Sequence, residues 1–281
     1  MKSNLPIGHS YINYTPYLSP VNPSEFTTCA LWLDASDYKS IEFVSGSVDK
    51  WKDKRNDTYT STRNLSSVGA TRPGYSTNVL NGNPVITFQG DNDTLISDVV
   101  QSENFNFSNL AYFLVVRPAT TQPTAAAKDL LGIISTDTSG LYGRSLGLNQ
   151  NTGTWREEYY SGFQNLSAYT GNTWYFVSLE FVGTTSAFFY VNGTASGSPV
   201  ASATGTNTTG LKIGSYNGDS SYAAFNGNFD VAEVIVFGHS STTLTSQQRQ
   251  QLEGYLAWKW GLTANLPSTH PFKNFPPLIV N

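Results

Sequence analysis

The pattern of apolar and polar residues predicts strands along most of the chain and one helix near its C-terminal end. Short apolar runs rich in β-branched and aromatic residues alternate with polar turns roughly every 8–12 residues, the spacing typical of an all-β sandwich. The predicted strands lie at 29–34, 41–44, 48–51, 85–88, 112–117, 130–134, 145–148, 154–160, 174–182, 187–191, 211–214 and 229–237. No break in this pattern marks a second domain.

The segment 229–261 carries the strongest local signals. Residues 229–237 are nearly all apolar, which predicts a strand buried on both faces. Thr245 and Gln248 have the spacing of a capping box, and apolar residues then recur at helical intervals. Gly261 stands where a left-handed helix cap belongs. We therefore predict a helix at about 246–260.

Residues 1–26 differ from the rest of the chain. They contain four prolines and three tyrosines without a sustained period, which predicts an extended segment. The segment is too apolar for a solvated tail, so we predict a docking arm that packs on its own domain or on a neighbouring subunit. The sandwich domain is then expected at 27–281.

Composition narrows the classes of function. Aromatic residues make up 14% of the chain and charged residues only 13%, about half the usual share. The net charge is −4 and no Lys/Arg cluster occurs, which excludes nucleic acid as a partner. No apolar stretch reaches the length of a membrane span, and residues 1–10 lack the apolar core of a signal peptide. The single cysteine, Cys29, is predicted to be a buried apolar residue.

Several motifs suggest a family. The segments 31–37 (LWLDASD), 48–54 (VDKWKDK), 81–90 (NGNPVITFQG), 230–236 (DVAEVIV) and 248–261 (QRQQLEGYLAWKWG) resemble LamG-like jelly-roll domains of the concanavalin A-like superfamily. The last segment is similar to the C-terminal signature of such domains in proteins of phages, large DNA viruses and marine bacteria. The resemblance implies an all-β jelly roll of two packed antiparallel sheets with a concave face. It does not imply one function, because this fold carries many.

The carboxylates of the predicted strand 229–237 do not match a catalytic pattern. Some relatives of the fold cleave polysaccharides with acids at positions i, i+2 and i+4 of one strand, which share a face. Asp230 and Glu233 are three residues apart and are expected to point to opposite faces. Glu233 is expected to share its face with Phe229, Val231, Ile235 and Phe237. We predict that it is a buried carboxylate held by Lys259 or Arg249, and that the protein is not an enzyme.

Aromatic residues near Gly, Asn and Ser are candidate sugar contacts, because sugar rings stack on exposed aromatic faces. These candidates are Tyr142, Trp155, Tyr159, Tyr160, Tyr216 and Tyr222. The tryptophans in apolar or helical contexts are instead predicted to be core residues: Trp32, Trp51, Trp174, Trp258 and Trp260.

Oxygen-rich turns are candidate calcium ligands, although each also fits an ordinary Asx turn. These ligands would be Asp91, Asp93 and Asp219. No other cofactor is predicted, and the three histidines lack the spacing of a zinc site.

Three hypotheses of function follow. The first is a virion structural or surface protein, of minor capsid or decoration type, that contacts other capsid proteins through the arm at residues 1–26. The second is a glycan-binding adhesion or host-attachment module, on a particle or in the extracellular space. The third and weakest is a glycosidase.

Overall fold

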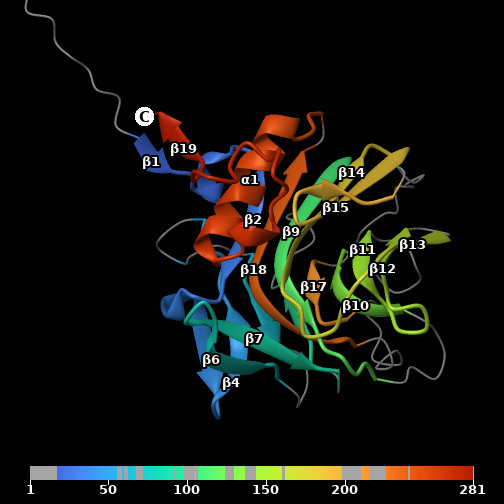
Figure 1. The fold of residues 1–281 in the computed structure, drawn as a ribbon. Helices are drawn as coiled ribbons and strands as arrows, with labels where there is room; N and C mark the ends of the chain where they lie inside the picture. The colour runs from blue at the N-terminus through green and yellow to red at the C-terminus, as the bar shows by residue number, and fades with distance from the viewer. Residues whose placement is uncertain are drawn as a thin grey trace, which may run out of the picture.

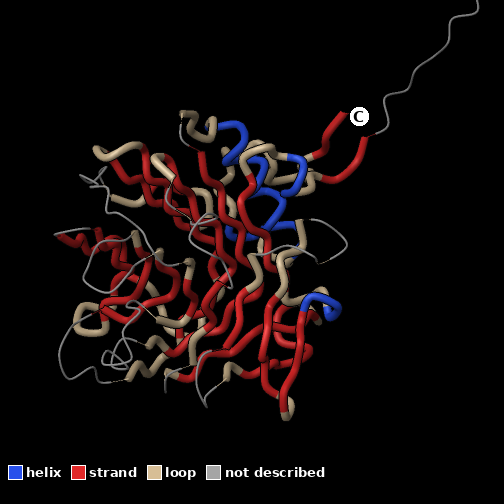
Figure 2. Tube along the Cα trace, turned by 180° about the vertical axis from the view of Figure 1, so that it is seen from behind, coloured by secondary structure: helices blue, strands red, loops and turns tan. Residues whose placement is uncertain are grey.

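The computed structural model describes residues 18–55, 59, 63–67, 72–90, 93–97, 105, 107–123, 130–136, 144–159, 162–197, 210–215, 226–239 and 241–280. Within these ranges the chain forms two large antiparallel sheets, a two-stranded ribbon and one α-helix, which confirms the predicted all-β sandwich (Figure 1). Figure 2 shows the same arrangement from behind, with strands making up most of the molecule. Among the described helices, none has the length and apolarity that a membrane crossing requires.

The first sheet has eight strands in the order β16-β15-β14-β9-β18-β7-β6, with β2 also paired to β18. Its strands are β2 (Cys29–Asp34), β6 (Gly74–Leu80), β7 (Asn83–Gln89), β9 (Asn109–Pro118), β14 (Tyr175–Val182), β15 (Ser186–Val191), β16 (Thr194–Ala195) and β18 (Asn228–His239).

The second sheet has nine strands in the order β13-β12-β11-β10-β17-β8-β5-β4-β3. Its strands are β3 (Ile41–Val44), β4 (Ser47–Trp51), β5 (Leu65–Ser67), β8 (Leu95–Ser97), β10 (Leu130–Ser135), β11 (Ser145–Asn149), β12 (Thr154–Tyr159), β13 (Gly162–Ala168) and β17 (Lys212–Ile213).

The remaining elements are short, apart from the helix. They are the ribbon strands β1 (Leu18–Pro20) and β19 (Leu278–Val280), the 3-10 turns η1 (Pro23–Glu25), η2 (Tyr38–Ser40) and η5 (Thr263–Asn265), and the helix α1 (Ser246–Lys259). The predicted helix at about 246–260 therefore exists almost to the residue.

Strand β18 is the centre of the eight-stranded sheet. It is 12 residues long and pairs with β9 along one side. On its other side it pairs first with β7 and then with β2. The register with β9 shifts between Val231 and Glu233, so Ala232 forms a β-bulge. Strand β18 thus holds three other strands together. At the bulge the alternation of its side chains between the two faces of the sheet is reversed.

The sheet faces separate two apolar cores. One core lies between the sheets, where β18 contributes Phe229, Val231, Val234 and Val236. The other lies between the eight-stranded sheet and α1, where β18 contributes Ile235 and Phe237 and the helix contributes buried apolar residues. In Figure 1 the helix lies across the sheet beside β2, β18 and β9. The sandwich therefore has three layers on this side, since α1 covers the outer face of one sheet.

The ends of α1 follow the sequence signals. The Thr245 side chain accepts a hydrogen bond from the Gln248 backbone N–H, and the Gln248 side chain caps Thr245 in return. Leu252, Leu256 and Trp260 face the sheet. Gly261 has φ +70°, the left-handed conformation that ends a helix.

Residues 18–26, which belong to the predicted arm, contact the rest of the domain. Strand β1 pairs with β19, and Val21 is buried and donates its N–H to the Pro277 carbonyl. Phe26 packs edge-on against Phe237, with ring centroids 5.8 Å apart. The ribbon lies at the edge of the molecule beside α1 (Figure 1). Residues 1–17 lie outside the described residues.

Two expectations about local structure need correction. Strands β5, β6 and β13 were not predicted, because their sequences are largely polar, and β8 was not predicted because its apolar run is only two residues long, Leu95 and Ile96. Trp258 is 38% exposed and is not a core residue, whereas Trp51 and Trp260 are fully buried as predicted. Cys29 is buried as predicted, and burial raises the pKa of its thiol to about 12.

Candidate functional site

Glu233 is a fully buried carboxylate between β18 and α1, and it accepts hydrogen bonds from four side chains. Its Oε1 accepts hydrogen bonds from Trp32 Nε1 at 2.6 Å and from the Tyr255 hydroxyl at 2.7 Å. Its Oε2 accepts from Lys259 Nζ at 2.8 Å and from Trp260 Nε1. The predicted partner Lys259 is thus confirmed.

Asp34, at the end of β2, joins the same network. Its Oδ2 lies 2.7 Å from Lys259 Nζ and 2.8 Å from Lys54 Nζ. Burial alone would raise the pKa of Asp34, but the two ammonium groups outweigh it and lower the pKa to about 2. Its other oxygen accepts from Ser36. Each oxygen of Glu233 and Asp34 thus has at least one protein donor, and the network attaches the helix to the sheet.

The bulge at Ala232 corrects the predicted faces of β18. Asp230 and Glu233 were expected on opposite faces, and Glu233 was expected beside Phe229 and Val231. One extra residue reverses the alternation, so both acids lie on the outer, helix-side face, and Phe229 and Val231 lie between the sheets.

Asp230 is also fully engaged. Its Oδ1 accepts from Thr87 Oγ1 at 2.7 Å, and its Oδ2 forms an ion pair with Arg117. The Arg117 guanidinium in turn lies 5.1 Å from the Trp174 ring. The two acids share a face, but Asp230 is paired with Arg117, whereas Glu233 is paired with Lys259, which it shares with Asp34.

A second charged cluster lies where β14 meets α1. Arg249 forms an ion pair with Glu253 at 2.8 Å and lies 3.5 Å from Glu180, while His270 Nε2 lies 3.2 Å from Glu253. Burial raises the pKa of Glu180 to about 7, with Arg249 opposing and Glu253 adding to the rise. Arg249, the other predicted partner of Glu233, therefore pairs with Glu253 and Glu180 instead.

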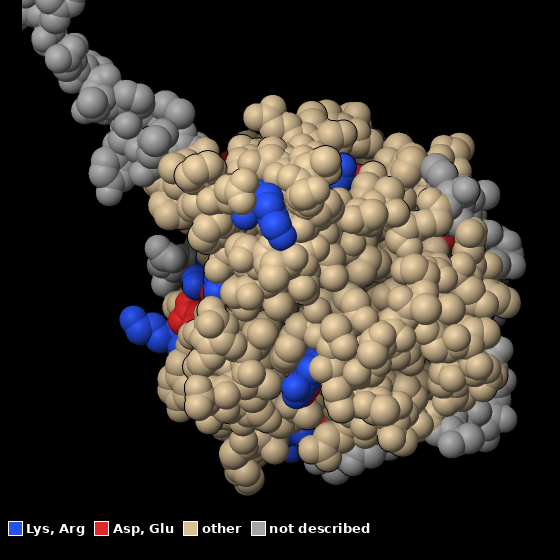
Figure 3. All heavy atoms as spheres, in the orientation of Figure 1, with Lys and Arg blue, Asp and Glu red and all other residues tan. Residues whose placement is uncertain are grey.

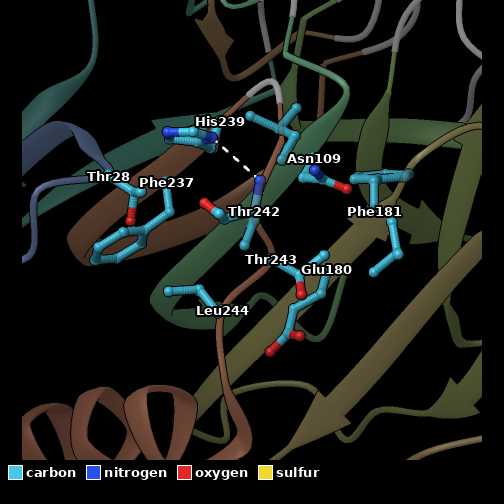
Figure 4. A pocket seen from close by; sticks show the side chains of 13 residues that line it. Thr28, Asn109, Glu180, Phe181, Phe237, His239, Thr242, Thr243 and Leu244 are labelled. Carbon is cyan, nitrogen blue, oxygen red and sulfur yellow. Dashed lines mark hydrogen bonds between the residues drawn. The ribbon is translucent and has the colours of Figure 1, made fainter.

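Next to this cluster is a cavity of about 20 Å³. Figure 4 shows Glu180, His239 and Thr242 among the side chains around it. Such a volume holds about one water molecule. The site thus encloses little space, and it is partly open to solvent.

Glu157 is the exception among the buried acids. It lies on β12 with Leu146 of β11 opposite it, on the face that points between the sheets. It is fully buried, and within the described part of the chain neither of its oxygens has a hydrogen-bond partner. Burial raises the pKa of Glu157 to about 8, and the charge of Arg144 only partly opposes this. The side chain is thus largely protonated at neutral pH.

The predicted sugar contacts are not brought together by the described residues. Trp155 is fully buried in the core between the sheets, packed on Tyr169, Tyr175 and Phe189, so the expectation of an exposed ring was wrong. The backbone of Tyr159 ends β12. The other four candidates lie outside the described residues: Tyr142, Tyr160, Tyr216 and Tyr222.

Of the predicted calcium ligands, only Asp93 is described. It is buried, and its Oδ2 accepts a hydrogen bond from the Gln89 backbone N–H at 3.1 Å, the geometry of a turn-stabilising side chain. Asp91 and Asp219 lie outside the described residues. Among the residues that are described, no group of three or more His, Cys, Asp or Glu side chains is arranged to hold a metal ion.

Sequence reasoning missed an exposed aromatic cluster at the rim of the sandwich. Tyr38 of η2 stacks on Phe43 of β3 with centroids 5.4 Å apart, and Tyr75 of β6 meets both rings edge-on. Tyr38 is 66% exposed. Asp37, beside it, accepts from Tyr59 OH and lies 3.3 Å from Lys54 Nζ. The three rings come from three elements, so no sequence motif marks them.

Comparisons with known proteins show the fold. No family model and no curated protein matches the chain. Among solved structures, the sialidase of Trypanosoma rangeli in complex with sialic acid is similar over 86% of this chain and 36% of its own, with 16% identity and a TM-score of 0.56. The binding domain of paraclostridial mosquitocidal protein 1 is similar over 83% of this chain and 53% of its own, with 12% identity and a TM-score of 0.55. The chain thus spans between a third and about half of these structures.

Replacing Lys259 with Met should destabilise the domain by about 3–5 kcal/mol, because Glu233 and Asp34 would lose the cation that they share in a buried site. Denaturant unfolding measures the change. Lys52→Met is the matched control, since its ion pair with Glu42 is half-exposed and contributes about 0–1 kcal/mol. Equal effects of the two substitutions would contradict the structural role of the network.

Stability should fall as pH rises from about 5 to 8. A carboxyl whose pKa is raised on folding stabilises the fold fully below its unfolded value of 4.5, and this contribution is lost as pH rises through the folded pKa of about 8 for Glu157 or about 7 for Glu180. Each group contributes a slope of at most about 1.4 kcal/mol per pH unit.

Melting temperatures of the Glu157→Gln variant across this pH range test the assignment. The variant should show a flatter profile than the parent protein, while Glu42→Gln, at a half-exposed acid, should leave the profile unchanged. An identical slope in the Glu157→Gln variant would show that this carboxyl is ionised in the folded state.

Proposed function

We propose that the chain is a non-enzymatic carbohydrate-recognition module, and that the rim cluster of Tyr38, Phe43 and Tyr75 is a site of sugar contact. The exposed ring of Tyr38 carries the proposal. Sugar rings present C–H groups on one face and hydroxyls at their edge, so they bind where a fixed aromatic face adjoins hydrogen-bonding groups.

The cluster meets both requirements. Stacking on Phe43 and edge contact with Tyr75 hold the Tyr38 ring in place, which lowers the entropy lost on binding. The Tyr75 hydroxyl donates to the Ala35 carbonyl at 3.0 Å and fixes the base of the cluster. Asp37 and Lys54 supply polar atoms beside the rings.

The character of the surface supports the same function. On the face shown in Figure 3, charged side chains form a few separate spots and most of the surface is uncharged. Such a surface suits neutral polar ligands better than nucleic acid. The similar structures include a sialidase bound to sialic acid and a toxin binding domain, which agrees with the proposal. The saturated acids Asp230 and Glu233 support recognition without bond cleavage.

Replacing Tyr38 with Ala should weaken glycan binding about tenfold, the loss expected for one stacking contact of about 1.4 kcal/mol. The parent protein is first screened on a glycan array that includes sialylated and neutral chains, and titration calorimetry with the strongest binder then measures the variant. Tyr38→Phe should retain most of the affinity, because it keeps the ring.

The matched control is Phe275→Ala, which removes another exposed aromatic side chain, 75% exposed and distant in sequence from the cluster. Its affinity should equal that of the parent. An array without binding above background, or equal affinity after Tyr38→Ala, would argue against this site.

A second candidate function is that of a structural or decoration protein of a virion. One observation favours it. The ribbon of β1 and β19 fixes the start of the described chain at the molecular edge, next to the exposed side chains of Phe275 and Leu278. An arm at residues 1–17 would leave the domain at this apolar edge, where a neighbouring particle protein could bind it.

A chain of residues 18–281 tests this second candidate against the full chain. It should keep the melting temperature, because β1, Val21 and Phe26 remain, but should no longer be incorporated into particles when produced alongside the other particle proteins. Normal incorporation of the shortened chain would remove the reason for a docking arm.

A further inference from the structure

Strand β13 is the last strand of the nine-stranded sheet. Within the described residues it pairs only with β12, so one edge of the sheet is open. The ladder is regular from the pair of Tyr159 with Gly162 to the pair of Arg156 with Asn165. Unpaired N–H and C=O groups along such an edge are a template for another strand.

The composition of β13 sets it apart from the other edges. Its seven residues, GFQNLSA, include neither a charged residue nor a proline. The opposite edge, β3, carries Glu42 and is irregular next to it. In the other sheet, β16 has only two residues and β6 loses its register after Ser76. Charge, shortness and irregularity are the usual means by which edges avoid pairing, and β13 relies on none of them along its regular part.

The exposed side chains of β13 are held in place by neighbouring residues, which also favours pairing with another strand. Phe163 is 54% exposed, yet its ring is held flat by the Arg156 guanidinium 3.6 Å from its centroid. Asn165 is held by Asn149, whose amide donates to it at 2.9 Å. Both side chains are thus fixed on the outer face of the sheet, and no described residue pairs with the backbone of the free edge.

We propose that β13 pairs antiparallel with β13 of a second copy of this chain about a two-fold axis near Gln164. An antiparallel pair of identical strands satisfies two-fold symmetry without a further element. The pairing brings no like charges together, because the strand carries none. Seven residues provide about 24 Å of edge, enough for several backbone hydrogen bonds, and Phe163 would be covered by the partner strand. The two nine-stranded sheets would then form one continuous sheet.

The test is the molecular mass of the full chain in solution, measured by sedimentation velocity. The parent protein should have twice the mass of one chain. Asn165→Lys should give monomers, because each lysine would face Phe163 of the partner strand and the two lysines would lie diagonally across the axis on the same face of the sheet, where like charges repel. Thr194→Lys, at the exposed edge strand β16 of the other sheet, should remain dimeric.

Charge reversal tests the pairing itself. Asn165→Glu should also be monomeric alone, but an equimolar mixture of Asn165→Lys and Asn165→Glu should recover the dimer, since opposite charges then lie diagonally across the axis within reach of each other. The proposal is overturned if the parent protein is monomeric at about 0.1 mM, if Asn165→Lys stays dimeric, or if the mixture stays monomeric.

Discussion

The burial of the Glu233 carboxylate beneath α1 is the interaction on which the rest of the structure depends. Trp32, which binds it, lies 201 residues away in sequence, while Tyr255, Lys259 and Trp260 belong to the helix and its cap. A buried carboxyl group in this position is tolerable only when its hydrogen-bond donors are present. Strand β2, strand β18 and helix α1 must therefore come together to bury this group, and we expect the three to fold cooperatively.

Local chemistry explains which features could be predicted from sequence. The capping residues Thr245 and Gln248 lie within one turn of a helix, so their spacing is sufficient to place them. The partner of Glu233 belongs to another element, so the sequence left it open between Lys259 and Arg249. The bulge at Ala232 could not be predicted, because an apolar residue in an apolar strand looks the same whether it is bulged or not. That single residue reversed the expected faces of Phe229 and Val231. Likewise β13 has no apolar run, and only its neighbour β12 makes it a strand.

The candidate binding site was harder to predict than the fold for a related reason. Trp155 lies near the start of a predicted strand, next to Gly and Asn, and was therefore predicted to be accessible, but its side chain fills the core between the sheets. Tyr38, in contrast, follows an aspartate in a short turn and gives no signal of its own. Its role depends on Phe43 and Tyr75, which reach it from two different sheets. Binding surfaces of this kind arise from tertiary structure and leave little trace in one sequence.

The pairing of β1 with β19 has a mechanical consequence. Leu18 lies opposite Val280, so the two strands run antiparallel and the first and last described residues lie at the same end of the ribbon. A force pulling these two points apart would break the residue pairs of the ribbon one after another. The two large sheets would carry no force until the ribbon had opened. The ribbon would then give way under tension before the sandwich does, and it could close again once the tension is released.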